Sequence, residues 1–191
     1  MRVARRAWSA CYSVPRHAFP MRAWSVNRKM TIYNEDQVYE LYLSSLETAI
    51  RKLKQIRVFC GNEPNFSGLG GWVFEQTIQH CIKKELKARK VKTEIAEQVK
   101  LKSRIKADLK IGNAAIEIKE SGLFSASDVA KYREYRKAAN DLGLEYLFIT
   151  GGERYQPYRR GITTALGKAN TFFLDTSGDW KRFINRLVHL K

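Results

Sequence analysis

The sequence has few cysteines and no long apolar run, and these absences exclude several classes of protein. Its three cysteines, Cys11, Cys60 and Cys81, show no C-x-x-C spacing and are odd in number, so a disulfide framework is not expected. None of the three histidines pairs with a cysteine at zinc-site spacing. No apolar run approaches the roughly 18 residues that span a bilayer. We therefore expect an intracellular, cytoplasmic protein with no membrane partner.

The charge of the chain is strongly positive. Its 35 Lys and Arg residues against 19 Asp and Glu residues give a formal net charge of +16 and a pI of about 9.9. Such an excess attracts polyanions, and nucleic acid is the leading candidate. An anionic membrane surface is a weaker one, because no predicted helix separates a basic face from a broad aromatic face. A generally basic, solvated surface is the alternative without a binding function.

Residues 1–29 differ from the rest of the chain in charge and pattern. They contain seven Lys or Arg residues, no Asp or Glu, and no helical or strand periodicity. Three interpretations are open: an organellar transit peptide, an extension upstream of a working start at Met30, or a flexible basic arm that touches nucleic acid. We expect a disordered or non-native extension followed by one domain over 30–191. Removing seven positive charges from +16 leaves +9, so the polyanion prediction does not depend on this segment.

The periodicity beyond Met30 predicts an α/β domain in which a mixed sheet is flanked by helices. Asn34 and Gln37 form a capping box that begins the first helix. The segment GLGG at 68–71 lacks the lysine and the preceding strand of a phosphate-binding loop, so it is interpreted as a flexible start to the second helix. The expected helices cover 34–57, 71–88, 125–142, 162–170 and 179–190, and the expected strands lie within 91–103, 104–111, 114–121, 144–152 and 171–176.

Two alternating segments, RIKADLKI and AAIEIKES, predict a β-hairpin around Gly112-Asn113. In the first segment, every second residue from Ile105 to Ile111 is expected on one face, and Asp108 on the other. The turn places Leu109 opposite Ile116, Ile111 opposite Ala114, and Asp108 opposite Glu117.

Directly opposed carboxylates such as Asp108 and Glu117 repel each other. Lys119 follows Glu117 on the same face and lies diagonal to Asp108. A divalent cation between the two carboxylates would cancel the repulsion. Hard oxygen ligands with room for water and phosphate suit Mg²⁺, with Mn²⁺ as the alternative.

Glu75 adds a third carboxylate from the predicted second helix. It falls on the stripe formed by Gly71, Ile78, Ile82 and Leu86. A carboxylate on an inward edge is costly to bury unless it is paired or bound to a metal. The alternative is that Glu75 lies at the margin of the stripe and reaches water.

Asp108, the segment Glu117-Ile118-Lys119 that begins nine residues later, and the upstream helical Glu75 resemble the PD-(D/E)XK nuclease superfamily. This superfamily includes many restriction endonucleases and archaeal Holliday junction resolvases. The resemblance covers roughly 67–151 and implies a restriction-endonuclease-like core with the order α-β-β-β-α-β. Ala107, not proline, precedes Asp108, at a position that varies in the superfamily.

The resemblance implies a role for each residue of the motif. Asp108 and Glu117 would hold Mg²⁺ with the backbone carbonyl of Ile118, and Glu75 would reach the metal directly or through water. Lys119 would orient the attacking water and help it lose a proton. The implied activity is metal-dependent hydrolysis of DNA phosphodiester bonds, which in the family typically leaves a 5′-phosphate and a 3′-hydroxyl.

Two basic segments near the predicted site are candidates for nucleic-acid binding. The helix over 125–142 is expected beside the site, and a predicted loop over 153–161 mixes arginines that bind phosphates with tyrosines that stack on unpaired bases. Either segment is also compatible with an ordinary solvated surface. Glu120 and Ser121 adjoin the motif without an assigned role. The candidate residues are Lys131, Arg133, Arg136, Lys137, Arg154, Tyr155, Tyr158, Arg159 and Arg160.

Several functional alternatives stay open. A sequence-specific restriction enzyme and a small structure-selective repair or junction nuclease both fit, and the 162 residues from Met30 favour the second slightly. Duplex or branched DNA is the expected partner, and cutting both strands would favour a homodimer. The rival from another class is a non-catalytic, basic nucleic-acid-binding protein that needs no metal. A DNA-bound protein of either kind is expected at the nucleoid.

Overall fold

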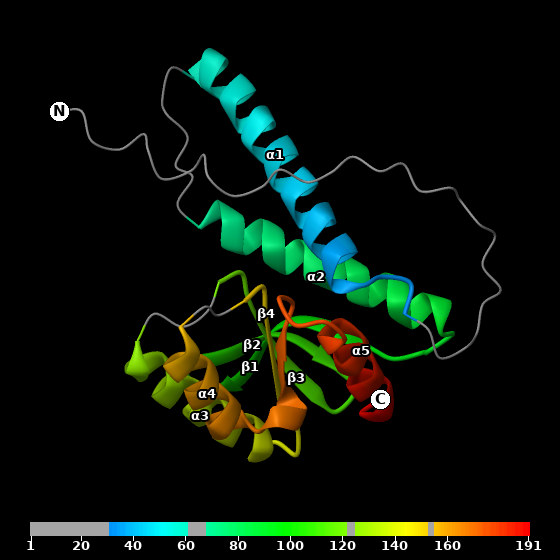
Figure 1. The fold of residues 1–191 in the computed structure, drawn as a ribbon, viewed down its shortest axis with the longest axis vertical. Helices are drawn as coiled ribbons and strands as arrows, with labels where there is room; N and C mark the ends of the chain where they lie inside the picture. The colour runs from blue at the N-terminus through cyan, green and yellow to red at the C-terminus, as the bar shows by residue number, and fades with distance from the viewer. Residues whose placement is uncertain (1–30, 61–67, 122–124, 153–154) are drawn as a thin grey trace.

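The computed structural model describes residues 31–60, 68–121, 125–152 and 155–191, without the side chains of 56–60. The predicted extension over 1–29 therefore lies outside the described residues. A five-stranded sheet forms the centre of the domain and carries helices on both faces (Figure 1). Among the described residues no helix is long and apolar enough to cross a membrane. The predicted α/β class, with a mixed sheet flanked by helices, is confirmed.

The described residues form five α-helices, one short 3-10 helix and five strands. In chain order these are α1 (Glu35–Cys60), α2 (Leu69–Ala88), β1 (Ile95–Lys102), β2 (Ile105–Ile111), β3 (Ala114–Lys119), α3 (Ala126–Asn140), β4 (Glu145–Thr150), α4 (Gln156–Leu166), η1 (Lys168–Asn170), β5 (Thr171–Phe173) and α5 (Asp179–His189).

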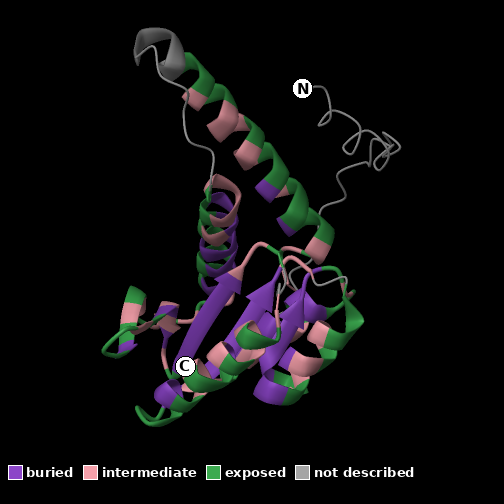
Figure 2. Ribbon diagram, turned by 90° about the vertical axis from the view of Figure 1, so that its left-hand side faces the viewer, coloured by how far each residue is buried: buried purple, intermediate pink, exposed green. Residues whose placement is uncertain are grey.

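Helix α1 begins with the predicted capping box. The Gln37 N–H donates to Asn34 Oδ1 at 2.9 Å, and the Asn34 N–H donates to Gln37 Oε1 at 3.0 Å. The Tyr42 ring then meets the Phe74 ring of α2 edge-on, with 5.3 Å between the ring centroids. Beyond this contact α1 projects away from the sheet, and its outer part is mostly exposed or half-buried (Figure 2).

The sheet has the strand order β1-β2-β3-β4-β5. The pairs β1–β2 and β2–β3 are antiparallel, whereas the pairs β3–β4 and β4–β5 are parallel. Two pairs of the predicted hairpin register are confirmed, Ile111 with Ala114 and Leu109 with Ile116, whereas the predicted pair of Asp108 with Glu117 is not part of the ladder. Gly112 adopts a φ of 54° in the turn, which packs closely against the C-terminal residues.

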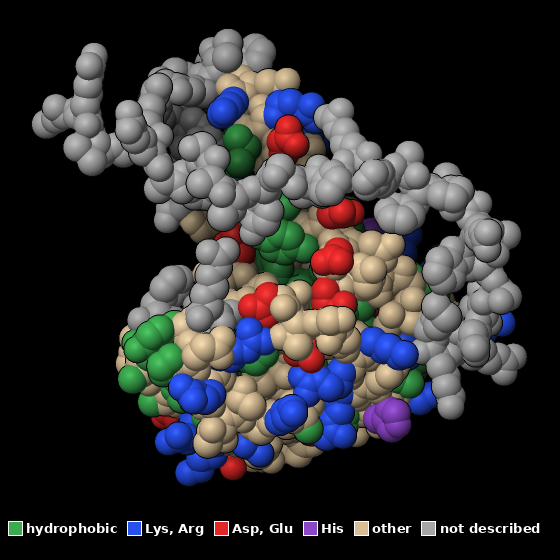
Figure 3. Space-filling model, viewed as in Figure 1, with side chains coloured by type: hydrophobic (Ala, Val, Ile, Leu, Met, Phe, Trp, Pro, Cys, Tyr) green, Lys and Arg blue, Asp and Glu red, His purple; other side chains and the backbone are tan. Residues whose placement is uncertain are grey.

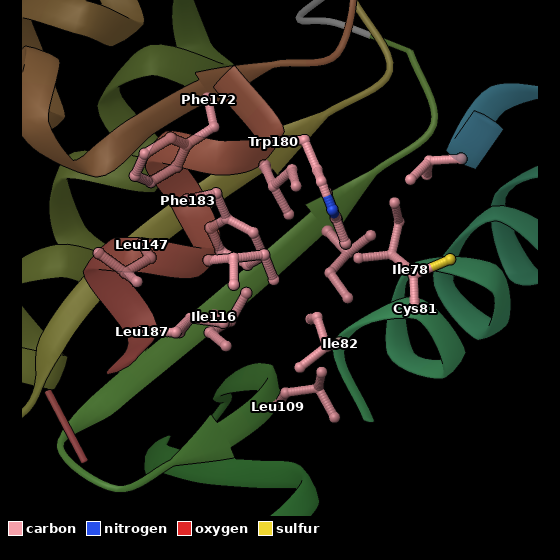
Figure 4. Close-up of a cluster of buried hydrophobic side chains, with 14 of the residues drawn as sticks. Ile78, Cys81, Ile82, Leu109, Ile116, Leu147, Phe172, Trp180, Phe183 and Leu187 are labelled. Carbon is pink, nitrogen blue, oxygen red and sulfur yellow. The ribbon is translucent and has the colours of Figure 1, made fainter. Parts of the chain in front are cut away.

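Two hydrophobic clusters lie on opposite faces of the sheet. The first packs the sheet against α1, α2 and α5, and includes Ile116, Trp180 and Phe183 (Figure 4). The second packs the sheet against α3 and α4, and includes Tyr132 and Phe148. Because helices cover both faces, β3 and β4 are buried along almost their whole length (Figure 2).

The predicted alternation of β2 is wrong at one point. Leu109 and Ile111 pack in the first cluster as one set, but Ala107 and Ile105 pack in the second cluster on the other face. The change of face therefore occurs at Asp108. The facing strand β1 is also irregular here, because Gln98 has a φ of 51°, a left-handed conformation that is uncommon outside glycine. Such irregularities re-aim the side chains beside them.

The predicted loop over 153–161 is also wrong in part. Helix α4 begins at Gln156, six residues before the expected short helix. Pro157 occupies the first turn of the helix, where the missing N–H costs nothing and the fixed φ is favourable. Tyr158, Ile162 and Leu166 follow at four-residue spacing and pack in the second cluster, so packing extends the helix through residues that looked like a polar loop.

Candidate active site

The four predicted catalytic residues come from three elements. Glu75 lies on α2, Asp108 on β2, and Glu117 and Lys119 on β3. The Lys119 Nζ lies 3.0 Å from Glu117 Oε1. The charge of Asp108 acts on Glu117, Lys119 and Glu75, and the charge of Glu75 acts on Lys119. The structure therefore brings the four side chains together. Figure 3 shows acidic side chains near the middle of the molecule and Lys and Arg side chains over the lower part of the same face.

Asp108 is held by the backbone of the neighbouring strand. The last paired residues of the hairpin are Leu109 and Ile116, so Asp108 and Glu117 are not themselves part of the ladder. Instead, the Ile118 N–H donates a hydrogen bond of 2.7 Å to Asp108 Oδ2. This bond ties the carboxylate to the Glu117-Ile118-Lys119 segment, which keeps both parts of the motif in a defined relation.

Gln98 is a site residue that the sequence analysis missed. The register on either side of it, with Glu97 opposite Leu109 and Val99 opposite Ala107, places Gln98 opposite Asp108. Its amide contacts Asp108 Oδ1 at 3.5 Å and also hydrogen-bonds to Glu75. Nothing in an alternating strand pattern indicates a left-handed glutamine, so only the pairing between β1 and β2 could have revealed it.

Glu117 is almost completely buried, with 4 % of its surface exposed. It lies on the same face of β3 as Ala115, under α3, because side chains alternate along a strand. The Lys119 side chain is 39 % exposed, so the ion pair reaches from the interior to the solvent. This geometry gives the pair one buried carboxylate and one ammonium that is accessible to a substrate.

The carboxylates of the site resist ionisation. Burial first, and then repulsion by Asp108, raise the pKa of Glu117 to about 7. Burial also raises the pKa of Asp108, against the lowering effects of the Ile118 N–H and Lys119. The pKa of Glu75 is raised by burial and by Asp108. Three neighbouring carboxyl groups therefore share an environment that penalises their negative charge.

Lys119 stays protonated in this environment. Burial lowers the pKa of its ammonium group, but attraction to Glu117, Asp108 and Glu75 outweighs burial, so the net shift of the pKa is upward. Lys131 on α3 adds a second positive charge, which opposes the upward shift in the pKa of both Glu117 and Asp108 without cancelling it. Its Nζ lies over the rings of Tyr132 and Tyr135, at 4.9 Å and 5.4 Å from their centroids.

Glu120, the residue after Lys119, anchors the end of β3. Its carboxylate accepts a hydrogen bond from the Tyr42 hydroxyl of α1 and lies against Gly70 of α2, where an added Cβ would meet Glu120 Oε2 at 2.7 Å. Its carbonyl oxygen lies 2.3 Å from the position of a Cβ on Gly151. The GLGG segment thus allows close approach of a carboxylate rather than of a phosphate, and this contact ties the site to α1 and α2.

The predicted nucleic-acid-binding residues have different environments. Lys131 lies beside the carboxylates, whereas the Arg136 Nη1 donates to the Ala165 carbonyl and thereby joins α3 to α4. Arg159 is paired with Asp175 and lies over the Phe173 ring, so its guanidinium is engaged within the domain. Arg154 lies outside the described residues. Exposed residues are Arg133, Lys137, Tyr155 and Arg160, and Tyr158 is partly buried against the second cluster.

The donor set of the site suits a hard divalent cation. Carboxylate oxygens are the ligands that Mg²⁺ and Mn²⁺ prefer. In the part of the chain that the structure describes, no three His, Cys, Asp or Glu side chains form a ready-made metal-binding group, and the Lys119 ammonium pairs with Glu117. The raised pKa values nevertheless indicate a cluster whose negative charge a divalent ion would stabilise. By the chemistry of their side chains, Asp108, Glu117 and Glu75 offer the oxygen donors that such an ion prefers.

Comparisons of the chain with family models, with curated proteins and with solved structures find no match. Function is therefore inferred from the side chains themselves. The three gathered carboxylates, the protonated lysine and the positive charge of the chain are the features that bear on it.

Proposed function

We propose that this protein is a metal-dependent nuclease that hydrolyses DNA phosphodiester bonds. The observation that carries the proposal is the meeting of Glu75, Asp108, Glu117 and Lys119, with a nearly buried Glu117 whose pKa is raised to about 7. Strongly shifted carboxyl groups beside a lysine are typical of catalytic sites. The net charge of +16 supports a polyanionic substrate.

The order of elements supports a restriction-endonuclease-like core. From α2 to β4 the chain runs α-β-β-β-α-β, with three antiparallel strands and a fourth strand parallel to the third. The motif residues occupy the second and third strands, and Glu75 occupies the helix before them. This arrangement supports the core that the resemblance to the PD-(D/E)XK superfamily implies.

Each residue of the site has a chemical task in the proposed reaction. Asp108 and Glu117 would bind the divalent ion, with Glu75 as the third carboxylate. When bound, such an ion polarises a phosphoryl oxygen and makes a bound water more acidic. The Ile118 N–H orients Asp108, and Gln98 and Gln79 orient Glu75, so the carboxylates are held before a substrate binds.

Lys119 acts as a fixed cation in this proposal. Because its pKa is raised, the ammonium keeps its proton at neutral pH and donates hydrogen bonds rather than removing a proton. It orients the attacking water and stabilises the negative charge that develops on the phosphate. This role differs in part from the one that the family resemblance implies, in which Lys119 also helps the water to lose a proton.

The proposal is tested by incubating the purified chain with Mg²⁺ or Mn²⁺ and a panel of supercoiled, linear, single-stranded, flapped and four-way-junction DNA. We expect a reproducible set of cuts that disappears with a chelator and in Lys119→Ala. Lys181→Ala is the matched control, because Lys181 is an exposed lysine on α5, a helix that contributes no residue to the site. Cleavage by Lys119→Ala at the wild-type rate would exclude this site as the source of the activity.

The rival function is non-catalytic binding of nucleic acid, which the positive charge of the chain favours equally. The two functions differ in metal dependence, because a ligand that binds only the folded state raises the melting temperature. We expect Mg²⁺ or Mn²⁺ to raise the Tm of the wild type and not that of Glu117→Gln. Tight DNA binding without metal stabilisation and without cleavage would favour the rival.

A further inference from the structure

A cleft of about 330 Å³ lies between α1 and α2. Its volume falls in the range of small-ligand sites, about 300–1,000 Å³. It combines apolar walls with a few polar groups. Its lining includes Leu41, Ser45 and Ala49 from α1, and Trp72, Gln76 and His80 from α2.

Trp72 is the most exposed large apolar side chain among the described residues, with 58 % of its surface accessible. It belongs to neither hydrophobic cluster, so the fold does not require an indole at this position. An exposed aromatic face in a cleft is a surface on which a planar base stacks, whatever the sequence of the nucleic acid.

The cleft adjoins the candidate active site along α2. Trp72 and Glu75 are three residues apart, so their side chains are neighbours on the helix surface. One turn further along, Gln76 lines the cleft, while Gln79 donates a hydrogen bond of 3.1 Å to Glu75. A strand bound at the carboxylates would therefore pass the mouth of the cleft.

Positively charged residues follow the α1 wall of the cleft, beyond the uncharged residues that line it. Leu41, Ser45 and Ala49 form a stripe on α1, and the exposed Lys52 continues this stripe three residues later. Arg51 and Lys54 flank it, and the only acidic residue of α1 after Glu40 is Glu47. The apolar walls thus lead to a cationic margin, which complements a base joined to a phosphate.

We infer that the α1–α2 cleft receives an unpaired base of a nucleic-acid strand, stacked on Trp72, with the neighbouring phosphates near Lys52. Bases inside a duplex are stacked on one another and do not enter a cleft between two helices. The substrates are therefore DNA molecules with unpaired nucleotides beside the cleavage point, such as flaps, frayed ends or junctions. This inference rests on the proposed nuclease function and adds the substrate class.

Binding without cleavage tests the inference separately from the nuclease proposal. We would measure fluorescence anisotropy in EDTA with a labelled dT oligonucleotide, a blunt duplex, and the same duplex carrying a single-stranded flap. Loss of one base stack weakens binding by about 1–3 kcal/mol, which is roughly 5- to 150-fold. Trp72→Ala should show this loss on dT and on the flap, with less than about twofold change on the blunt duplex. Trp72→Phe should retain most of the affinity.

Leu142→Ala is the matched control, because Leu142 is an exposed apolar residue in the turn between α3 and β4. Equal loss on blunt and flapped duplex, or no loss on either, would overturn the inference. A wild type that is dimeric and becomes monomeric in Trp72→Ala would assign the cleft to a second copy and overturn it as well. A chain that binds unpaired DNA through Trp72 and cuts no DNA with any metal would refute the nuclease function and leave the binding site.

Discussion

Two buried carboxylates, Glu85 of α2 and Glu117 of the candidate site, have opposite surroundings. Glu85, in the C-terminal half of the helix, is fully buried, and its Oε1 accepts hydrogen bonds from three donors. These are the Ile32 N–H at 2.8 Å, the Tyr33 N–H at 3.0 Å and the Trp180 indole N–H at 3.2 Å. Glu117, in the candidate active site, contacts Lys119 and is repelled by Asp108.

Burial of a carboxylate therefore does not by itself mark a functional site. Glu85 receives neutral donors from the segment before α1 and from α5, so its charge joins three parts of the fold. Glu117 lies beside Asp108, which repels both Glu117 and Glu75, and the pKa values of all three carboxyl groups are raised. A buried acid surrounded by donors stabilises a structure, whereas gathered acids keep a binding capacity for a cation.

The largest effect on stability is expected from Glu85→Ala. This change leaves two backbone N–H groups and the Trp180 indole without an acceptor, and leaves Arg89, whose Nε lies 3.6 Å from Glu85 Oε2, without a counter-charge. The free energy of unfolding should fall by about 3–5 kcal/mol. Urea denaturation measures this loss. The cleavage rate per folded molecule should stay at the wild-type value, and a selective loss of activity would contradict the distinction between the two groups.

Lys119→Ala should have the reverse profile. Removal of a single charge-stabilising donor costs roughly 10²- to 10³-fold in rate. Because the Lys119 side chain is 39 % exposed, the free energy of unfolding should change by less than about 1 kcal/mol. Parallel measurement of cleavage rate and urea midpoint separates the two effects. A Lys119→Ala protein that is strongly destabilised would instead indicate a structural ion pair.

Glu117→Gln should change how stability depends on pH in the absence of metal. The pKa of Glu117 is raised to about 7 in the folded protein from about 4.5 in the unfolded chain, so the protonated form favours folding. This contribution is fully present below about pH 4.5 and is lost as the pH rises through about 7. The variant should gain roughly 2–3 kcal/mol relative to wild type between pH 5 and pH 8.

Chemical denaturation of both proteins at pH 5 and pH 8 gives this difference directly. Asp108 and Glu75 stay titratable in the variant, so part of the pH dependence should persist. The matched control is Glu97→Gln, because Glu97 is an exposed acid of β1 paired with Lys83. Wild-type stability that does not fall between these pH values would show that Glu117 ionises without penalty.

The smallest expected effect concerns Gln98, which links the two carboxylates of α2 and β2. Gln98→Gly relieves a left-handed backbone at a φ of 51°, so stability should rise by up to about 1 kcal/mol. Loss of the amide that orients Glu75 and Asp108 should lower cleavage by roughly tenfold. Gln98→Ala should lose activity to the same extent without the gain in stability, which makes the pair of variants its own control.

Local signals predicted much of the fold. The capping box at Asn34, the two-residue turn at Gly112-Asn113 and the apolar stripe of α5 depend on residues close in sequence, and the structure confirms all three. Helix α4 was predicted too short, because the burial of Tyr158 against α3 and the sheet is not visible in a segment that is polar and contains proline.

The candidate site, like the fold, was predictable only as far as it depends on residues close in sequence. The hairpin register indicated that Asp108, Glu117 and Lys119 belong together, because a short turn fixes which residues face each other. Gln98 and the change of face at Asp108 were not predictable. The position of Gln98 arises from the pairing of β1 with β2, and the change of face arises because Ala107 packs in the cluster that α3 covers.

The α/β class, the hairpin with its carboxylates and lysine, and the positive charge that favours a polyanionic partner were all predictable from the sequence alone. Each of these follows from composition or from residues within one turn or one hairpin. The sequence did not show which buried acids accept several hydrogen bonds and which lie beside other acids. The donors to Glu85 come from residues 52, 53 and 95 positions away, and Glu75 reaches Asp108 across 33 residues. Such distances in sequence are closed by packing of helices on the sheet, which no local pattern encodes.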